Sequence, residues 1–188
     1  MLHVRRYGDP VLREVAVSVE RVDGHICELA DEMLGIMRDG NGIGLAAEQV
    51  GRTEAICVVH LPAELDMDKH GVRMNPGINM PLILINPEIT RFSEERLSGE
   101  EGCLSLPGIS LMVTRAESID VKYLDRKGVG NEISVCGMLG RCIQHEVDHL
   151  KGLLIIDHVS KMKRMSISGR LKRLKQETRA VLNQKYGM

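Results

Sequence analysis

His145, Glu146 and His149 have the types and the spacing of a hydrolytic metal site. They lie in the run QHEVDH, inside an apolar pattern that is typical of a helix. On a helix, residues four apart lie on one face, so both imidazoles can bind the same metal ion. The carboxylate of Glu146 then lies beside that ion as a proton carrier. The spacing therefore predicts metal-assisted hydrolysis.

Two histidines are an incomplete catalytic site, because a zinc-type centre has three protein ligands and an open position. A zinc endopeptidase would take its third ligand from downstream, where His158 is the only histidine and Glu177 the only glutamate. Upstream, Cys103 lies in a turn-rich segment beside a predicted strand. Because cysteine with two histidines is a known catalytic ligand set, Cys103 is the better candidate. A zinc endopeptidase of the His-Glu-x-x-His type is the alternative.

Length and composition limit the class of protein. With 188 residues, 43% of them hydrophobic, the chain can form one domain, residues 1–188, with a sizeable core. Its five cysteines are an odd number without a C-x-x-C pair, and the first residues lack the apolar core of a signal peptide. No apolar run approaches the roughly 20 residues of a membrane-spanning helix. We therefore expect a cytoplasmic protein with neither membrane nor DNA as partner.

The last residues, 161–188, differ from the rest in charge. They contain nine Lys or Arg and the single Glu177, a net charge of +8, which leaves −9 on residues 1–160. The segment also predicts an amphipathic C-terminal helix that docks on the body. Its apolar residues at helical spacing are Ile167, Leu171, Leu174, Val181 and Leu182. The basic side is either a solvated face or a contact for a polyanion such as RNA.

The predicted elements indicate an α+β fold with antiparallel sheets around a central metal-binding helix. A first helix at 24–38 has Asp23 as its N-cap, and the metal-binding helix spans about 138–151, ending at Gly152. Residues 42–51 are predicted to form a glycine-rich loop, residues 61–81 an exposed loop and residues 125–130 a hairpin turn. Strands are predicted at 55–60, 82–86, 109–114, 118–124 and 131–136.

Three blocks of the chain resemble the signature motifs of peptide deformylases. They are GIGLAAEQVG at 42–51, EGCLSLPG at 101–108 and QHEVDHLKG at 144–152, in the family's order. The segment DPVLR at 9–13 resembles the opening of that family. Peptide deformylases remove the formyl group from N-terminal formyl-methionine of nascent polypeptides and release formate. The resemblance implies that formyl-methionyl nascent peptides are the substrates, and the basic tail suggests the ribosome as a further partner.

The resemblance also implies roles for individual residues. Cys103, His145 and His149 would bind one divalent metal ion, Fe²⁺ ahead of Zn²⁺, Ni²⁺ or Co²⁺. Water activated by that ion would attack the formyl carbonyl, with Glu146 as general acid and base. The developing oxyanion would be held by two further groups, the side-chain amide of Gln49 and the backbone N–H of Leu104.

The pocket for the substrate departs from the family pattern at two positions. Arg141 stands where the resemblance predicts an apolar residue, and Gly99 replaces a larger side chain. The pocket is therefore either more open or more polar than usual. Asp148 has two interpretations, a partner that orients the site or an ordinary surface acid. The residues expected to contact or shape the substrate site are Ile43, Gly44, Gly102, Arg115, Met138 and Cys142.

Overall fold

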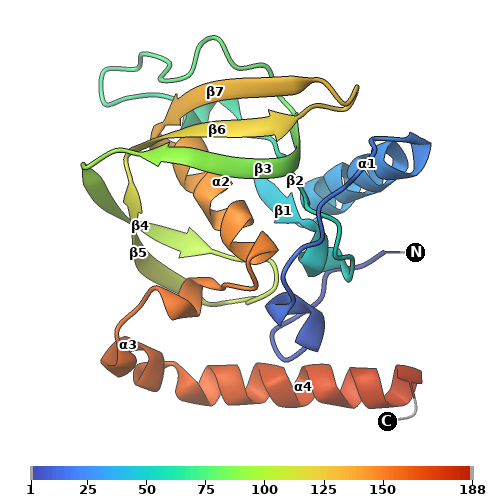
Figure 1. Cartoon of the computed structure of the whole chain (residues 1–188). Helices are drawn as coiled ribbons and strands as arrows, with labels where there is room; N and C mark the ends of the chain where they lie inside the picture. The colour runs from blue at the N-terminus through green and yellow to red at the C-terminus, as the bar shows by residue number, and fades with distance from the viewer. Residues whose placement is uncertain (1, 187–188) are drawn as a thin grey trace.

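The computed structural model of this chain describes residues 2–186 and has the predicted α+β architecture (Figure 1). Within these residues, the larger antiparallel sheet has the strand order β1-β2-β3-β6-β7, and the smaller one pairs β4 with β5. The larger sheet consists of β1 (Gly44–Ala46), β2 (Ile56–Val59), β3 (Leu82–Phe92), β6 (Ser118–Leu124) and β7 (Gly130–Cys136). The smaller sheet consists of β4 (Arg96–Gly102) and β5 (Ser110–Ala116).

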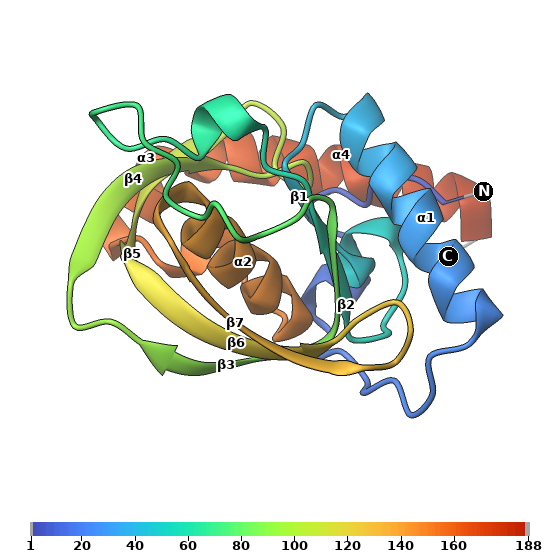
Figure 2. The same ribbon diagram turned by 90° about the horizontal axis from the view of Figure 1, so that it is seen from above.

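The predicted metal-binding helix is α2 (Gly137–Leu150), and it lies between the two sheets (Figures 1 and 2). Ten of its fourteen residues are buried, because strands surround it on more than one side. Leu139, Ile143 and Val147 pack into the core under the larger sheet. The chain leaves the helix through Gly152, whose φ of +69° favours glycine. This confirms the predicted helix and its end.

The helix α1 (Gly24–Asp39) begins where the N-cap was predicted, since the backbone N–H of Ile26 donates to Asp23 Oδ1 at 3.0 Å. Successive side chains of β2 point to opposite faces of the sheet, so α1 and α2 can pack on opposite faces of the same strand. Ile56 and Val58 pack in the core with α1, whereas Cys57 and Val59 pack in the core with α2. The strand is buried on both faces, which accounts for its continuous apolar run.

Two strands were absent from the sequence prediction. Residues 42–51 contain β1 and a short 3₁₀ helix, η2 (Ala47–Val50), where only a loop was predicted. β4 is mostly exposed and polar, so it has no local apolar alternation. It forms because all seven of its residues pair in register with β5. Backbone hydrogen bonds to β5 therefore hold β4 in the sheet, and no local side-chain pattern reveals them.

The predicted loop at 61–81 is anchored more firmly than an exposed loop would be. It contains a single turn of 3₁₀ helix, η3 (Ala63–Leu65), followed by the buried Asp66. The side chain of Asn75, also buried, donates to Asp66 at 2.5 Å. The backbone N–H of Cys136 donates to Asn75 Oδ1 at 3.0 Å, which ties the loop to the end of β7.

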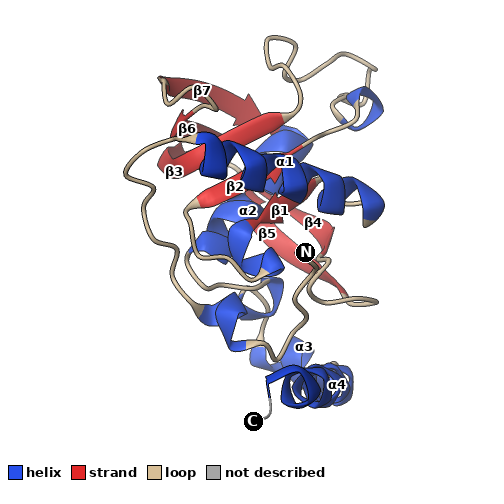
Figure 3. Ribbon diagram, turned by 90° about the vertical axis from the view of Figure 1, so that its right-hand side faces the viewer, coloured by secondary structure: helices blue, strands red, loops and turns tan. Residues whose placement is uncertain are grey.

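The basic tail forms two helices where one was predicted. α3 (Lys161–Ser166) and α4 (Ser168–Tyr186) meet at Ile167, and α4 lies across one end of the molecule (Figures 1 and 3). Ile167 and Leu171 are buried in a core with η1 (Pro10–Arg13) and η4 (Ile155–Asp157), but Val181 is 58% exposed. Docking therefore uses the first half of the predicted stripe. Among residues 2–186 no helix has both the length and the apolar composition needed to cross a bilayer.

Candidate metal centre

Cys103, His145 and His149 meet where the end of β4 passes α2. Cys103 directly follows β4, and the two histidines lie one turn apart on α2. Their ligand atoms lie within 4.8 Å of one another, and Nε2 of His149 is 3.3 Å from Sγ of Cys103. One sulfur and two imidazole nitrogens at such separations fit a single divalent cation with room for a further ligand.

Glu101 orients the first of these histidines. Nδ1 of His145 donates to Oε2 of Glu101 at 3.0 Å, which leaves Nε2 as the nitrogen that can bind a metal. Arg115 donates to both oxygens of Glu101 at 2.9 Å. Although burial acts in the opposite direction, the hydrogen bonds from His145 and Arg115 lower the pKa of Glu101 to about 2. Sequence analysis missed this role, and its only signal was an acid two residues before Cys103.

The surroundings of Cys103 favour its thiolate. Burial opposes ionisation, but the charge of His149 and the hydrogen bonds from both histidines lower the pKa of the Cys103 thiol well below its ordinary value. Metal ions bind the thiolate and not the thiol. The donor set therefore offers one anionic sulfur and two nitrogens to a cation.

The carboxylate of Glu146 occupies space that depends on Gly44. A Cβ at Gly44 would lie 2.3 Å from Oε1 of Glu146 and 2.7 Å from Sγ of Cys142. Oε2 of Glu146 is buried and has no hydrogen-bond partner within residues 2–186. Burial raises the pKa of Glu146 to about 7, against the opposite effect of the two neighbouring histidines. Such a carboxyl group can accept and return a proton near neutral pH.

Two hydrogen-bond donors lie beside the ligands. Oε1 of Gln49 accepts from the backbone N–H of Ala46 at 2.8 Å, which sets the orientation of the amide. Nε2 of Gln49 consequently faces Sγ of Cys103 and Oγ of Ser105, each at 3.4 Å. The backbone N–H of Leu104 donates to no group in the described part of the chain. Both donors can therefore serve a bound molecule.

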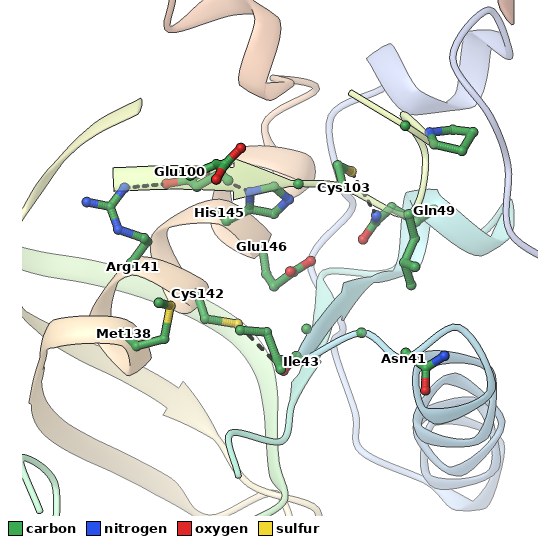
Figure 4. Close-up of a pocket in the computed structure, with 17 residues that line it drawn as sticks. Asn41, Ile43, Gln49, Glu100, Cys103, Met138, Arg141, Cys142, His145 and Glu146 are labelled. Carbon is green, nitrogen blue, oxygen red and sulfur yellow. Dashed lines mark hydrogen bonds and ion pairs between the residues drawn. The ribbon is translucent and has the colours of Figure 1, made fainter. Parts of the chain in front are cut away.

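A cavity of about 450 Å³ opens in front of the ligands (Figure 4). It lies between the edge strands β1 and β4 and one side of α2. Cys103, His145 and Glu146 line it together with Gln49 and Leu104. Five of the six residues predicted to contact or shape the substrate site also line it, namely Ile43, Gly44, Gly102, Met138 and Cys142.

Comparison with known proteins agrees with this geometry. A family model described as polypeptide deformylase matches residues 1–165. The chain belongs to the peptide deformylase family. A peptide deformylase of Rhizobium meliloti strain 1021 is 46% identical to it over 83% of each chain, and one of Opitutus terrae is 43% identical over 95% of each. The crystal structure of peptide deformylase from Ehrlichia chaffeensis matches with a TM-score of 0.83 and 37% identity, over 97% of this chain and 99% of that one.

This deformylase is a metal-dependent hydrolase that removes formyl groups from nascent peptides. The zinc endopeptidase alternative is not supported, because the chain belongs to the peptide deformylase family and the candidate ligand group contains the upstream Cys103. Neither downstream candidate lies in that group. His158 is 2.7 Å from Asp148, and Glu177 pairs with Arg173 on α4.

Arg115 does not line the cavity, where a contact with substrate would require it to lie. Its side chain is only 5% exposed, and Arg115 is not among the residues that line the cavity of the deformylase. The guanidinium donates to Glu101 and also to Asp148. Asp148 therefore acts through Arg115 on the carboxylate that orients His145. The predicted contact between Arg115 and substrate has no support in this arrangement.

Glu48 is, besides Glu101 and Glu146, a further buried carboxyl group near the site of the deformylase. It belongs to the same block as Gln49, is 0% exposed, and neither of its oxygens has a hydrogen-bond partner within residues 2–186. Burial raises its pKa to about 8, and the negative charges of Glu146, Glu14 and Glu54 act in the same direction. Glu48 is therefore a neutral acid at pH 7, which sequence reasoning did not detect.

Because the folded-state pKa of Glu48 is raised, the stability that this group contributes is complete below pH 4.5 and is lost as pH rises towards about 8. Replacing Glu48 by Gln is expected to leave the free energy of unfolding almost unchanged at pH 5. At pH 9 the variant should be more stable by about 2 kcal/mol or more, since one pKa unit corresponds to about 1.4 kcal/mol. Urea unfolding at both pH values measures this, with the exposed Glu88→Gln as control. A gain equal at both pH values would contradict the assignment.

Proposed function

We propose that this deformylase hydrolyses the formyl amide of N-terminal formyl-methionine with one divalent cation held by Cys103, His145 and His149. The supporting observation is the meeting of three ligand atoms within 4.8 Å beside the buried carboxylate of Glu146. When bound, such a cation lowers the pKa of water and polarises the formyl oxygen. A thiolate with two imidazoles suits borderline soft ions. We propose Fe²⁺ as the native ion and Zn²⁺, Ni²⁺ and Co²⁺ as ions that can replace it.

Glu146 moves the proton in both halves of the reaction. Its carboxylate takes a proton from the attacking water as the carbonyl carbon becomes tetrahedral. It then returns that proton to the methionine nitrogen, so that the C–N bond can break and release formate. Oε2 of Glu146 has no competing hydrogen bond in the described residues, and Gly44 leaves room for the whole group.

Gln49 and Leu104 stabilise the oxygen that gains negative charge. Nε2 of Gln49 already points at the ligand Cys103, and the N–H of Leu104 is not used elsewhere in residues 2–186. Donors that are fixed in place before the reaction need no reorganisation at the transition state. Losing one such donor costs about 3 kcal/mol in comparable sites.

The peptide substrate binds as an extended strand between β1 and β4. Both are edge strands of their sheets and flank the cavity, so each has backbone groups available for strand addition. Gly44 and Gly102, at the ends of these strands, let the substrate backbone approach closely. The methionine side chain enters the cavity against the apolar side chains of Ile43, Met138 and Cys142.

Formate release from formyl-Met-Ala tests this proposal directly. The full chain is loaded with Fe²⁺ without oxygen, or with Zn²⁺, and is expected to release formate and Met-Ala in equal amounts. Acetyl-Met-Ala is the matched control, because its extra methyl group must fit between the ligands and the oxyanion donors. Protein that holds one equivalent of metal but releases no formate would reject the proposal.

The basic helices α3 and α4 are proposed to bind ribosomal RNA close to the emerging chain, in the cytoplasm. Residues 161–188 contain nine Lys or Arg, and the eight before Lys185 are exposed. Docking through Ile167 and Leu171 leaves Lys163 and Lys172 exposed. A phosphate backbone attracts such a surface strongly at low salt.

Cosedimentation with ribosomes measures this contact. The double variant Lys163→Glu, Lys172→Glu is expected to lose most cosedimentation at low salt, and high salt should release the unmodified protein. Both lysines are exposed, so the fold should be unaffected. The exposed Lys122→Glu on β6 is the matched control. Equal binding by the double variant and the control would mean that the tail serves only for packing.

A further inference from the structure

Arg141 lines the cavity, but the proposed mechanism does not use it. It projects from α2 one turn before His145. Its Nη1 donates to Oε1 of Glu101 at 2.8 Å and to the carbonyl of Val113 at 2.9 Å, and its Nη2 donates to the carbonyl of Leu97 at 2.6 Å. The side chain is 11% exposed. The guanidinium is therefore held firmly against β4 and β5.

Gly99 on β4 provides the space that this guanidinium occupies. A Cβ at Gly99 would lie 3.0 Å from Cζ of Arg141, 3.1 Å from Nη2 and 3.2 Å from Nε. Contacts this short are tight, so even a Cβ at position 99 would require the guanidinium to shift by a few tenths of an ångström. Gly99 therefore leaves the space in which the guanidinium of Arg141 lies.

Arg141, in the space at Gly99, changes the chemistry of one wall of the cavity. Met138, Arg141 and Cys142 all project from α2 into the lining (Figure 4). Nε of Arg141 donates to no acceptor in the described residues, yet it is not among their buried unpartnered atoms. It is therefore an accessible donor on a lining that includes the thioether of Met138 and the thiol of Cys142, with the polar groups of Glu100, Glu101, His145 and Glu146 elsewhere on the same cavity.

A donor at this place matters for side chains that carry an oxygen. An acceptor oxygen that enters an apolar pocket loses its hydrogen bonds to water, and this loss weakens binding unless a donor replaces them. Methionine sulfoxide has nearly the shape of methionine but carries a strong acceptor oxygen. An arginine N–H is a charge-assisted donor, which forms the stronger class of hydrogen bond.

We propose that Arg141, in the space left by Gly99, is a specificity-determining residue that lets this enzyme also deformylate peptides whose first residue is methionine sulfoxide. The inference rests on the proposed function and concerns the same cavity. The oxidised side chain accepts a hydrogen bond from Arg141, while unmodified methionine packs on Met138 and Cys142 as before. The reaction at the formyl group is unchanged.

The test compares kcat/KM for formyl-Met-Ala and formyl-methionine-sulfoxide-Ala. In Arg141→Leu, the preference for the unoxidised peptide is expected to rise about tenfold over the unmodified enzyme, as for loss of one charge-assisted hydrogen bond. In the double variant Gly99→Val, Arg141→Leu, the added methyl groups refill the space. Its kcat/KM for formyl-Met-Ala should equal or exceed that of Arg141→Leu, while its kcat/KM for the sulfoxide peptide stays low. Arg91→Leu, on the exposed part of β3 away from the cavity, is the arginine control.

The ratio of the two substrates separates specificity from support of the fold. Arg141 also contacts Glu101, so its loss can lower both rates together without changing their ratio. An unchanged ratio in both the single and the double variant, with formyl-Met-Ala still hydrolysed, would overturn this inference alone. If the unmodified enzyme with bound metal released formate from neither peptide, the proposed function would fail as well.

Discussion

Replacing Glu146 by Gln is expected to lower kcat/KM for formyl-Met-Ala by about 10³-fold or more while one equivalent of metal stays bound. The amide has the size of the carboxyl group and therefore fits the space beside Gly44. It can neither take a proton from water nor return one to the leaving nitrogen, and such general acid–base transfer contributes about 10²- to 10⁴-fold. Formate release together with metal analysis of the same sample measures both properties.

Two comparisons make this result specific. Glu132→Gln removes a carboxylate from the exposed face of β7 and should leave formate release unchanged. Glu146→Asp keeps the carboxylate but withdraws it from the ligands, so it should retain an intermediate activity. If Glu146→Gln kept more than a tenth of the activity, another group would have to carry the proton.

The second large effect is expected from Cys103→Ala, which should lose most of its bound metal and, with it, nearly all activity. Sγ of Cys103 is the single anionic donor of the proposed ligand set, and the two imidazoles alone bind a cation much more weakly. Metal content after dialysis and the thermal unfolding temperature with and without added Zn²⁺ measure the effect. Added Zn²⁺ should raise that temperature in the unmodified protein but hardly in the variant.

Cys142→Ala is the matched control for this experiment, because Cys142 is a thiol that lines the same cavity but lies outside the ligand group. It should keep one equivalent of metal. Full metal retention by Cys103→Ala would show that a different residue is the third ligand. The variant His149→Ala, which keeps Cys103, should lose its metal to the same extent in the same measurement.

Elements with a strong local signal agree with the prediction made from the chain alone. α1 and α2 show regular helical spacing and recognisable ends, and β6 has the predicted bounds, Ser118–Leu124. β4 and β1 were missed because their pairing partners, and not their own side chains, make them strands. The break at Ile167 was missed for a similar reason, since it follows from how α4 docks on the body.

The residues of the site also divide into those with a local sequence signal and those without one. His145, Glu146 and His149 were recognisable because a single helix positions all of them, and the signature blocks indicated Cys103 and Gln49. Which partner each group has could not be predicted, because these contacts join strands and helices that are distant in the chain. Arg115, for example, was expected at the substrate but lies buried between two acids.

By itself, the amino-acid sequence determined the candidate reacting groups, the family resemblance and the helix that bears two candidate ligands, because each of these depends on residue type and short spacing. Only the tertiary structure decided that Glu101 orients His145, that Glu48 is buried without a partner and that Arg141 fills the space at Gly99. Burial and close approach depend on the whole packed chain, and no local pattern contains them.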